Sequence, residues 1–192
     1  GLASTDLIIV DDGASGTNRK SQVSRIKTYL ETVGHYANIY VDSSKMHPCT
    51  TNGAAALAKN EYGTNDVDVQ YFAFDGGATE ERVQFSIVMP EDWNRGTIKA
   101  KAGDTVEWGL KANALADNAA IDAALGTPQI VSDTLLGNSG TKMQVTPATP
   151  AITVGGTASL NNLIVFEIYR NTDGTDDMAE DAWLFGLNIQ YQ

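Results

Sequence analysis

The stretch DVDVQYFAFDGGATEERVQFSIVMPEDWNRGTIKAK, residues 66–101, decides the fold class of this chain. Side chains from Val67 to Phe74 alternate between two faces, as they do along a β-strand. The segment DGGA at 75–78 supplies a glycine-rich reversal, and a second strand follows from Val83 to Met89. Pro90 removes a backbone donor and ends it. We therefore predict an antiparallel hairpin.

Short strand-like segments recur through the rest of the chain, with turn residues between them. No long helical segment separates them, which favours a mostly β fold, an antiparallel two-sheet sandwich of jelly-roll type. The alanine-rich segment 118–126 is either one helical interruption or a loop. The predicted strands span 38–41, 67–74, 83–89, 97–101, 105–112, 127–133, 142–146, 151–153, 162–170 and 182–191.

The first 35 residues have a different pattern. The run LIIV at 7–10 predicts a short strand, and a short amphipathic helix is predicted after a cap at Ser21, ending near Gly34. A strand and one short helix bury too little surface to be stable alone. This strand-helix unit either packs on the rest of the chain or anchors it to a larger assembly. The apolar residues expected to make the attachment are Leu7, Ile9, Val23, Ile26 and Leu30.

Charge divides the chain in a similar way. Aspartate and glutamate outnumber lysine and arginine by 24 to 13, for a formal net charge of −11. Residues 1–50 carry five acidic and five basic side chains, so the excess negative charge belongs to residues 51–192. We expect an attachment segment at 1–35, a linker or first strand at 36–50, and a β-sandwich domain at 51–192.

The same composition limits the partners. An acidic chain without a basic stripe is repelled by phosphate backbones, so we expect no nucleic-acid partner. No apolar run approaches the roughly 20 residues needed to span a bilayer, so we expect no membrane partner. The amino terminus lacks a basic segment followed by an apolar one, so no export signal is expected.

Candidate catalytic residues have simple structural alternatives. Cys49 is the only cysteine, and His47 lies two residues before it, but no third group in the sequence orients this pair as a nucleophile and base. Neither His35 nor His47 has metal-ligand spacing to another histidine or cysteine. The neighbours in the Glu80-Glu81 pair point to opposite faces of a strand and cannot flank one glycosidic bond. We expect no enzyme activity, and no catalytic, cofactor-binding or metal-binding residues.

The acidic segment NTDGTDDMAED at 171–181 is the best candidate for a metal. Calcium prefers several carboxylate and carbonyl oxygens from one bent loop. The segment lacks the D-x-[DN]-x-[DN]-G register and a glutamate at the twelfth position, so a solvated turn is the preferred interpretation.

Four aromatic residues are alternative binding candidates. Tyr62, Trp93, Trp108 and Trp183 would serve as stacking platforms if the chain were a carbohydrate-binding or receptor-binding module. We expect Trp93 and Trp108 to be buried instead. The ring of Trp93 is expected to cover the end of a core while its N–H reaches water.

Several motifs in the central and C-terminal parts of the chain resemble one family. They are Thr50-Thr51-Asn52-Gly53-Ala54-Ala55, Asp75, Glu80, Gln84-Phe85, Met89-Pro90, Trp93-Asn94-Arg95-Gly96-Thr97, Val106-Glu107-Trp108-Gly109-Leu110, Val165-Phe166-Glu167-Ile168-Tyr169-Arg170 and Leu184-Phe185-Gly186-Leu187. In this order they resemble a domain of tail-fibre and virion structural proteins of tailed bacteriophages and prophages. The connection from Lys101 to Asp104 is shorter than in that family, so either the hairpin there is tight or a loop is absent. Residues 6–30 also resemble the amino-terminal attachment segments of phage fibres.

The resemblance implies a non-catalytic structural protein located in the virion and assembled in the host cytoplasm. It would be a short fibre, a spike knob or a capsid decoration, with capsid or tail proteins as partners and host surface glycan as a further candidate. Phage fibres and knobs are commonly threefold, so the resemblance also implies a homotrimer. Apolar residues on both faces of 163–169 and 183–185 independently favour a self-association surface.

Overall fold

A computed structural model of the chain describes residues 7–10, 19–22, 25, 37–77, 79–93, 98–101, 106–134, 143–176 and 178–192. The structure is mostly β, and its sheets are built from antiparallel strand pairs. The chain divides into a small unit, residues 1–37 with Gln192, and a large unit, residues 38–191. Each unit is described by itself below.

The small unit contains a two-stranded sheet. Strand β1 (Leu7–Val10) pairs with β2 (Arg19–Gln22), with Leu7 opposite Gln22 and Ile8 opposite Ser21. The strand predicted at 7–10 is therefore confirmed. The predicted helix cap at Ser21 is wrong, because Gln22, which would be the first helical residue after it, lies in β2. The attachment residues Val23, Ile26 and Leu30 lie outside the described residues.

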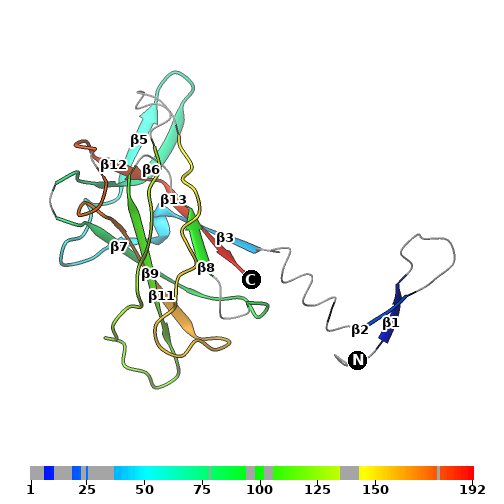
Figure 1. Ribbon diagram of the computed structural model, residues 1–192. Helices are drawn as coiled ribbons and strands as arrows, with labels where there is room; N and C mark the ends of the chain where they lie inside the picture. The colour runs from blue at the N-terminus through cyan, green and yellow to red at the C-terminus, as the bar shows by residue number, and fades with distance from the viewer. Residues whose placement is uncertain are drawn as a thin grey trace. The chain divides into compact units, whose positions relative to one another are not determined.

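The large unit is organised around a five-stranded sheet of order β10-β9-β11-β7-β4. Strand β11 is its centre, because it pairs with β9 on one side and with β7 on the other along nearly its whole length (Figure 1). The strands are β4 (His47–Pro48), β7 (Arg82–Val88), β9 (Trp108–Leu115), β10 (Gln129–Val131) and β11 (Leu163–Arg170).

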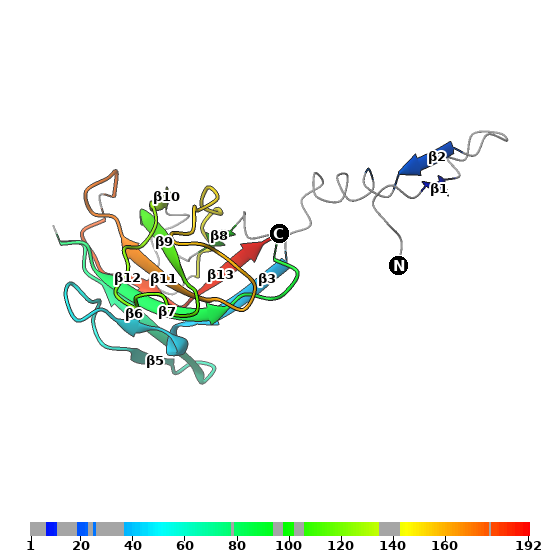
Figure 2. The same cartoon turned by 90° about the horizontal axis from the view of Figure 1, so that it is seen from below.

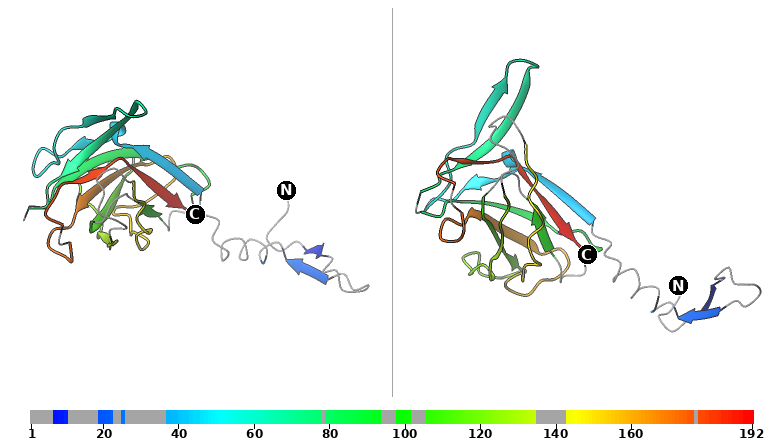
Figure 3. Two further views of the ribbon diagram at one scale, coloured as in Figure 1. Left: turned by 90° about the horizontal axis from the view of Figure 1, so that it is seen from above. Right: turned by 45° about the horizontal axis from the view of Figure 1, so that its top comes forward.

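Two three-stranded sheets complete the large unit, with orders β12-β6-β5 and β3-β13-β8. Figures 2 and 3 show β9, β10 and β11 on one side of this unit and β3, β5 and β6 on the other. A 3-10 turn, η1 (Ser43–Lys45), follows β3 and is capped by the Asp42 side chain. The strands are β3 (Ala37–Asp42), β5 (Ala58–Tyr62), β6 (Val67–Phe74), β8 (Ile98–Lys101), β12 (Ala182–Leu184) and β13 (Gly186–Tyr191).

The core follows from strand alternation. On β11 the side chains of Ile164, Phe166 and Ile168 are buried, and Phe166 stacks on Phe85 of β7 with ring centroids 5.1 Å apart. Phe74 of β6 contacts Trp108 of β9 edge to face, at 5.0 Å. Since β6 and β9 belong to different sheets, this aromatic contact joins the sheets through the core.

The hairpin predicted across residues 67–89 is wrong. Strands β6 and β7 are where the sequence predicts strands, but they pair in different sheets. Both edges of β6 are occupied, by β5 and β12, so the glycine-rich segment carries the chain from one sheet to another. A hairpin between β8 and β9 is also wrong, because β8 pairs with β13 and β9 with β10 and β11.

Two predicted strands in the C-terminal half are not formed. Residues 143–146 and 151–153 lie outside the strands, although Ile152 makes an isolated bridge to Ile98. Gln144 and Thr146 are buried while Met143 and Val145 are exposed. Buried and exposed side chains therefore alternate in a segment that packs against the large unit without pairing in a sheet.

The single strand predicted at 182–191 is wrong, because the structure divides it into β12 and β13, which belong to different sheets. The other predicted strands of the large unit agree with the structure apart from their ends, and the alanine-rich segment 118–126 is a loop. Ile121 in this loop is 88% exposed, so no core contact would hold a helix there. None of the described residues forms a helix with the length and hydropathy to cross a membrane.

Candidate functional site

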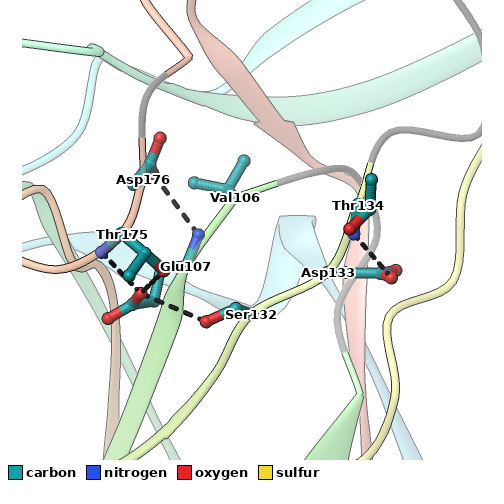
Figure 4. A pocket seen from close by; sticks show the side chains of 7 residues that line it. All are labelled: Val106, Glu107, Ser132, Asp133, Thr134, Thr175 and Asp176. Carbon is teal, nitrogen blue, oxygen red and sulfur yellow. Dashed lines mark hydrogen bonds between the residues drawn. The ribbon is translucent and has the colours of Figure 1, made fainter.

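A polar pocket of about 320 Å³ lies where three segments meet near the amino-terminal end of β9 (Figure 4). Residues just before β9, just after β10 and in the loop after β11 line it. The lining residues are Val106, Glu107, Ser132, Asp133, Thr134, Thr175 and Asp176. Its chemistry is that of carboxylates and hydroxyls.

Glu107 is the buried centre of this pocket, 7% exposed. Its Oε2 accepts hydrogen bonds from the Thr175 backbone N–H at 2.9 Å, from the Thr175 hydroxyl at 2.7 Å and from the Ser132 hydroxyl at 3.1 Å. Its Oε1 accepts from the Asn171 side chain. Gly174 is required beside it, because a Cβ at that position would overlap Oε1.

Arg170 holds the second carboxylate. Its side chain is fully buried, and it forms a bidentate pair with Asp176 at 2.8 and 3.0 Å. Its remaining donors reach the backbone carbonyls of Phe74, Met178 and Glu180. One guanidinium therefore joins the end of β6 to the loop 171–181, and such forked contacts are the strongest side-chain hydrogen bonds.

These contacts set the ionisation of both acids. Burial by itself raises the pKa of Glu107, but hydrogen bonds from Thr175, Asn171 and Ser132 bring it below the ordinary value. Burial likewise raises the pKa of Asp176, and Arg170 together with the Met178 N–H lowers it below the ordinary value. Both groups are therefore carboxylates at neutral pH, already matched by donors of the chain itself.

The expectation that 171–181 forms a solvated turn is wrong for its anchoring residues. Asn171 is buried and the Asp176 side chain is only 2% exposed, because both bind the interior through Glu107 and Arg170. Asp173, Gly174 and Thr175 between them are exposed. Within the described ranges, no three histidine, cysteine or acidic side chains come together in a way that could hold a metal ion.

A third buried carboxylate, Glu167, lies on the face of β11 opposite the core. The cross-strand residues Gln84 and Lys111 contact it, with Gln84 Nε2 2.7 Å from Oε2 and Lys111 Nζ 2.8 Å from Oε1. Arg82 Nε lies 3.8 Å from Oε1. Two cations and an amide thus surround one acid that is 4% exposed.

Cys49 belongs to this second network, and its thiol lies 3.9 Å from Glu167 Oε2 as a donor. Burial and then the charge of Glu167 raise the pKa of Cys49. A raised pKa disfavours the thiolate, which is the reactive form. His47, two residues earlier, is exposed on β4 opposite Gln84. His35 lies outside the described residues.

The two glutamates at 80 and 81 have separate partners. Glu80 pairs with Arg82 at 3.1 Å, and Glu81 accepts from the Asp75 backbone N–H at 2.8 Å. Both side chains thus stabilise the segment that carries the chain from β6 to β7.

The candidate stacking residues fall into two groups. Trp93 and Trp108 are 3% and 1% exposed, which confirms that they are buried. The expectation that the Trp93 N–H reaches water is wrong, because its Nε1 is covered and has no hydrogen-bond partner in the described structure. Tyr62 and Trp183 are half-buried, and Trp183 stacks on Tyr71 at 3.9 Å.

Sequence reasoning missed Glu107, Glu167 and Arg170. The signal was present, because each is a charged residue in an otherwise apolar strand segment, VEWGL or LIVFEIYR. Charged residues are almost never fully buried unless they are paired. Their partners lie from 6 to 118 residues away along the chain, and only the fold identifies them.

Comparisons with known proteins add no assignment. Neither the protein-family models nor the curated protein sequences contain a match to this chain.

Proposed function

We propose that this chain is a non-catalytic structural protein of a bacteriophage virion, a short fibre, spike knob or capsid decoration that displays a β domain. The two-sheet jelly-roll sandwich predicted from the sequence belongs to this proposal. The observation that carries it is the division into a small unit at 1–37 and a compact β body at 38–191. The assignment to a virion rests on the resemblance of residues 50–187 to virion structural proteins of phages.

The polar clusters of the body are consistent with a structural role. Glu107, Glu167 and Asp176 are each matched by donors from the chain itself. Buried carboxylates that are matched by donors in this way stabilise one arrangement of the backbone. The contacts of Arg170 hold the loop 171–181 in place, which is useful in a domain that is exposed to solvent on the particle surface.

Attachment is assigned to residues 1–35, with Leu7 and Ile9 of β1 among its contact residues. A two-stranded sheet alone is marginally stable in water, so this unit needs a partner surface. The partner we propose is a capsid or tail protein.

Deletion of residues 1–37 tests this division of labour. The remaining chain should melt cooperatively and stay soluble, because its core contacts lie within 38–191, but it should no longer enter particles. Calorimetry and a blot of purified particles measure the two results. Normal incorporation of the truncated chain would assign attachment to the β body instead.

We also propose that the chain is a homotrimer on the particle. Val88 and Leu163 are cross-strand neighbours, 54% and 39% exposed, so they form an exposed apolar surface. Leu160, three residues before Leu163, is 40% exposed. Like charges at −11 per chain oppose close approach, so association through this surface should tighten with added salt. Light scattering across salt concentrations should detect trimers, and Val88→Asp should weaken them. If the chain is a monomer at tens of micromolar at every salt concentration, trimerisation is not a property of the isolated chain and requires the particle.

A further inference from the structure

An aromatic cluster lies on the face of β6 and β12 that points away from the core. Trp183 stacks on Tyr71 with ring centroids 3.9 Å apart, and Phe185 meets both rings edge-on at 6.1 and 6.4 Å. Their strand neighbours Phe72 and Leu184 are buried, whereas the three cluster rings are half-buried. The cluster therefore presents ring surface to the outside.

Tyr40 extends this aromatic surface across the start of β13. Leu184 and Leu187 are both buried, whereas the two residues between them, Phe185 and Gly186, are both partly accessible. The Tyr40 ring, 62% exposed, lies over Gly186, where a Cβ would overlap it. Its hydroxyl reaches the Phe185 carbonyl at 3.4 Å.

A pair of amides continues the same face. Asn188 Nδ2 donates to Asn38 Oδ1 at 3.3 Å, two residues beyond the Tyr40 and Gly186 contact on each strand. Asn188 Oδ1 is covered and has no hydrogen-bond partner within the described structure. A covered acceptor without a donor costs free energy, so a ligand hydroxyl that turns this amide and donates to it would recover that cost.

We infer that these residues form a binding strip for a neutral glycan. The strip consists of Asn38, Tyr40, Tyr71, Trp183, Phe185 and Asn188, none of which carries a charge at neutral pH. Aromatic faces offer contact to the apolar C–H face of a pyranose ring, and amides both donate to and accept from its hydroxyls.

Charge selects among the possible occupants. The six strip residues offer no cation to an anionic glycan, and the net charge of −11 repels such a glycan at long range, whereas it has no effect on a neutral sugar. The inference goes beyond the structural role, because the isolated chain would bind sugar without any particle.

Trp183 provides a direct reporter of occupancy. The other two tryptophans, Trp93 and Trp108, are 3% and 1% exposed, so acrylamide should quench the Trp183 emission selectively. A sugar seated on the strip should shield Trp183 from acrylamide, while the buried pair stays unaffected.

The experiment uses the full chain and a glycan array, followed by titration of the best neutral oligosaccharide with acrylamide quenching. We expect saturable protection of Trp183, weakened about tenfold or more by Tyr40→Ala and by Asn188→Ala. Ile121→Ala, in the loop 118–126 and 88% exposed, is the control outside the strip, and it should bind as the unmodified chain does. Melting curves verify that each variant is folded.

Several results would overturn the inference. They are an array without neutral-glycan binding, binding that survives both strip variants, or loss of binding in Ile121→Ala alone. Protection of Trp183 that rises with protein concentration in the absence of sugar would identify a second copy as the occupant instead.

Discussion

Single buried charges organise the C-terminal half of this chain. Arg170 satisfies three backbone carbonyls as well as Asp176, so the loop after β11 depends on one guanidinium. Removing one member of a buried pair leaves the other uncompensated, which costs more than the pair itself contributes.

Asp176→Asn should therefore lower the free energy of unfolding by about 3–5 kcal/mol. Asp173→Asn in the same loop is the matched control, and it should change stability by less than about 0.5 kcal/mol because Asp173 is exposed. Urea denaturation measures both. With Arg170→Met and the double variant, a thermodynamic cycle should give a coupling energy above about 1 kcal/mol. Additive losses would contradict the contact.

At the scale of elements, the loop 171–181 should respond to acid. The pKa values of Glu107 and Asp176 lie below their ordinary values of 4.5 and 3.8. A lowered pKa in the folded state contributes stability above the unfolded value, and this stability is lost as pH falls through the folded value. The unfolding free energy should therefore decrease from about pH 5 downward.

Glu107→Gln isolates this effect. The variant should be less stable than the original chain at pH 7, and the difference should shrink by pH 3, where the Glu107 of the original chain is increasingly protonated. Urea denaturation at both pH values gives the comparison, with the exposed Glu61→Gln as control. A difference of equal size at pH 7 and pH 3 would show that Glu107 acts only through its shape.

Sequence patterns located many of these elements but not their pairing. The alternation of Val67–Phe74 predicts β6 with its full length, and LIVFEIYR predicts β11. Strand pairing depends on which strand edges are free, and both edges of β6 are occupied, by β5 and by β12. The sequence did not predict β5, because its sequence AKNEY is polar. It did not predict the pairing with β12, because β12 is short and distant along the chain. The polar pocket could not be predicted from the sequence either, because its three segments are separated along the chain and meet only when the strands pair.

At the scale of the whole molecule, the division at residue 37 and the character of the body's surface suggest two separate tasks. The small unit is proposed to attach, and the β body is proposed to be displayed, with the aromatic and amide strip on its outer face as a contact for host sugars. These tasks require no chemistry from the buried acids, whose partners are internal.

Particle imaging tests the central claim most directly. A copy of the full chain with a C-terminal epitope tag would be produced in cells that assemble the particles, and purified particles would be gold-labelled and viewed by electron microscopy. The account predicts gold at regular positions on the outer surface of head or tail, and none on particles made with a tagged copy that lacks residues 1–37. Unlabelled particles, recovered from cells in which the tagged full chain is abundant and folded, would contradict it.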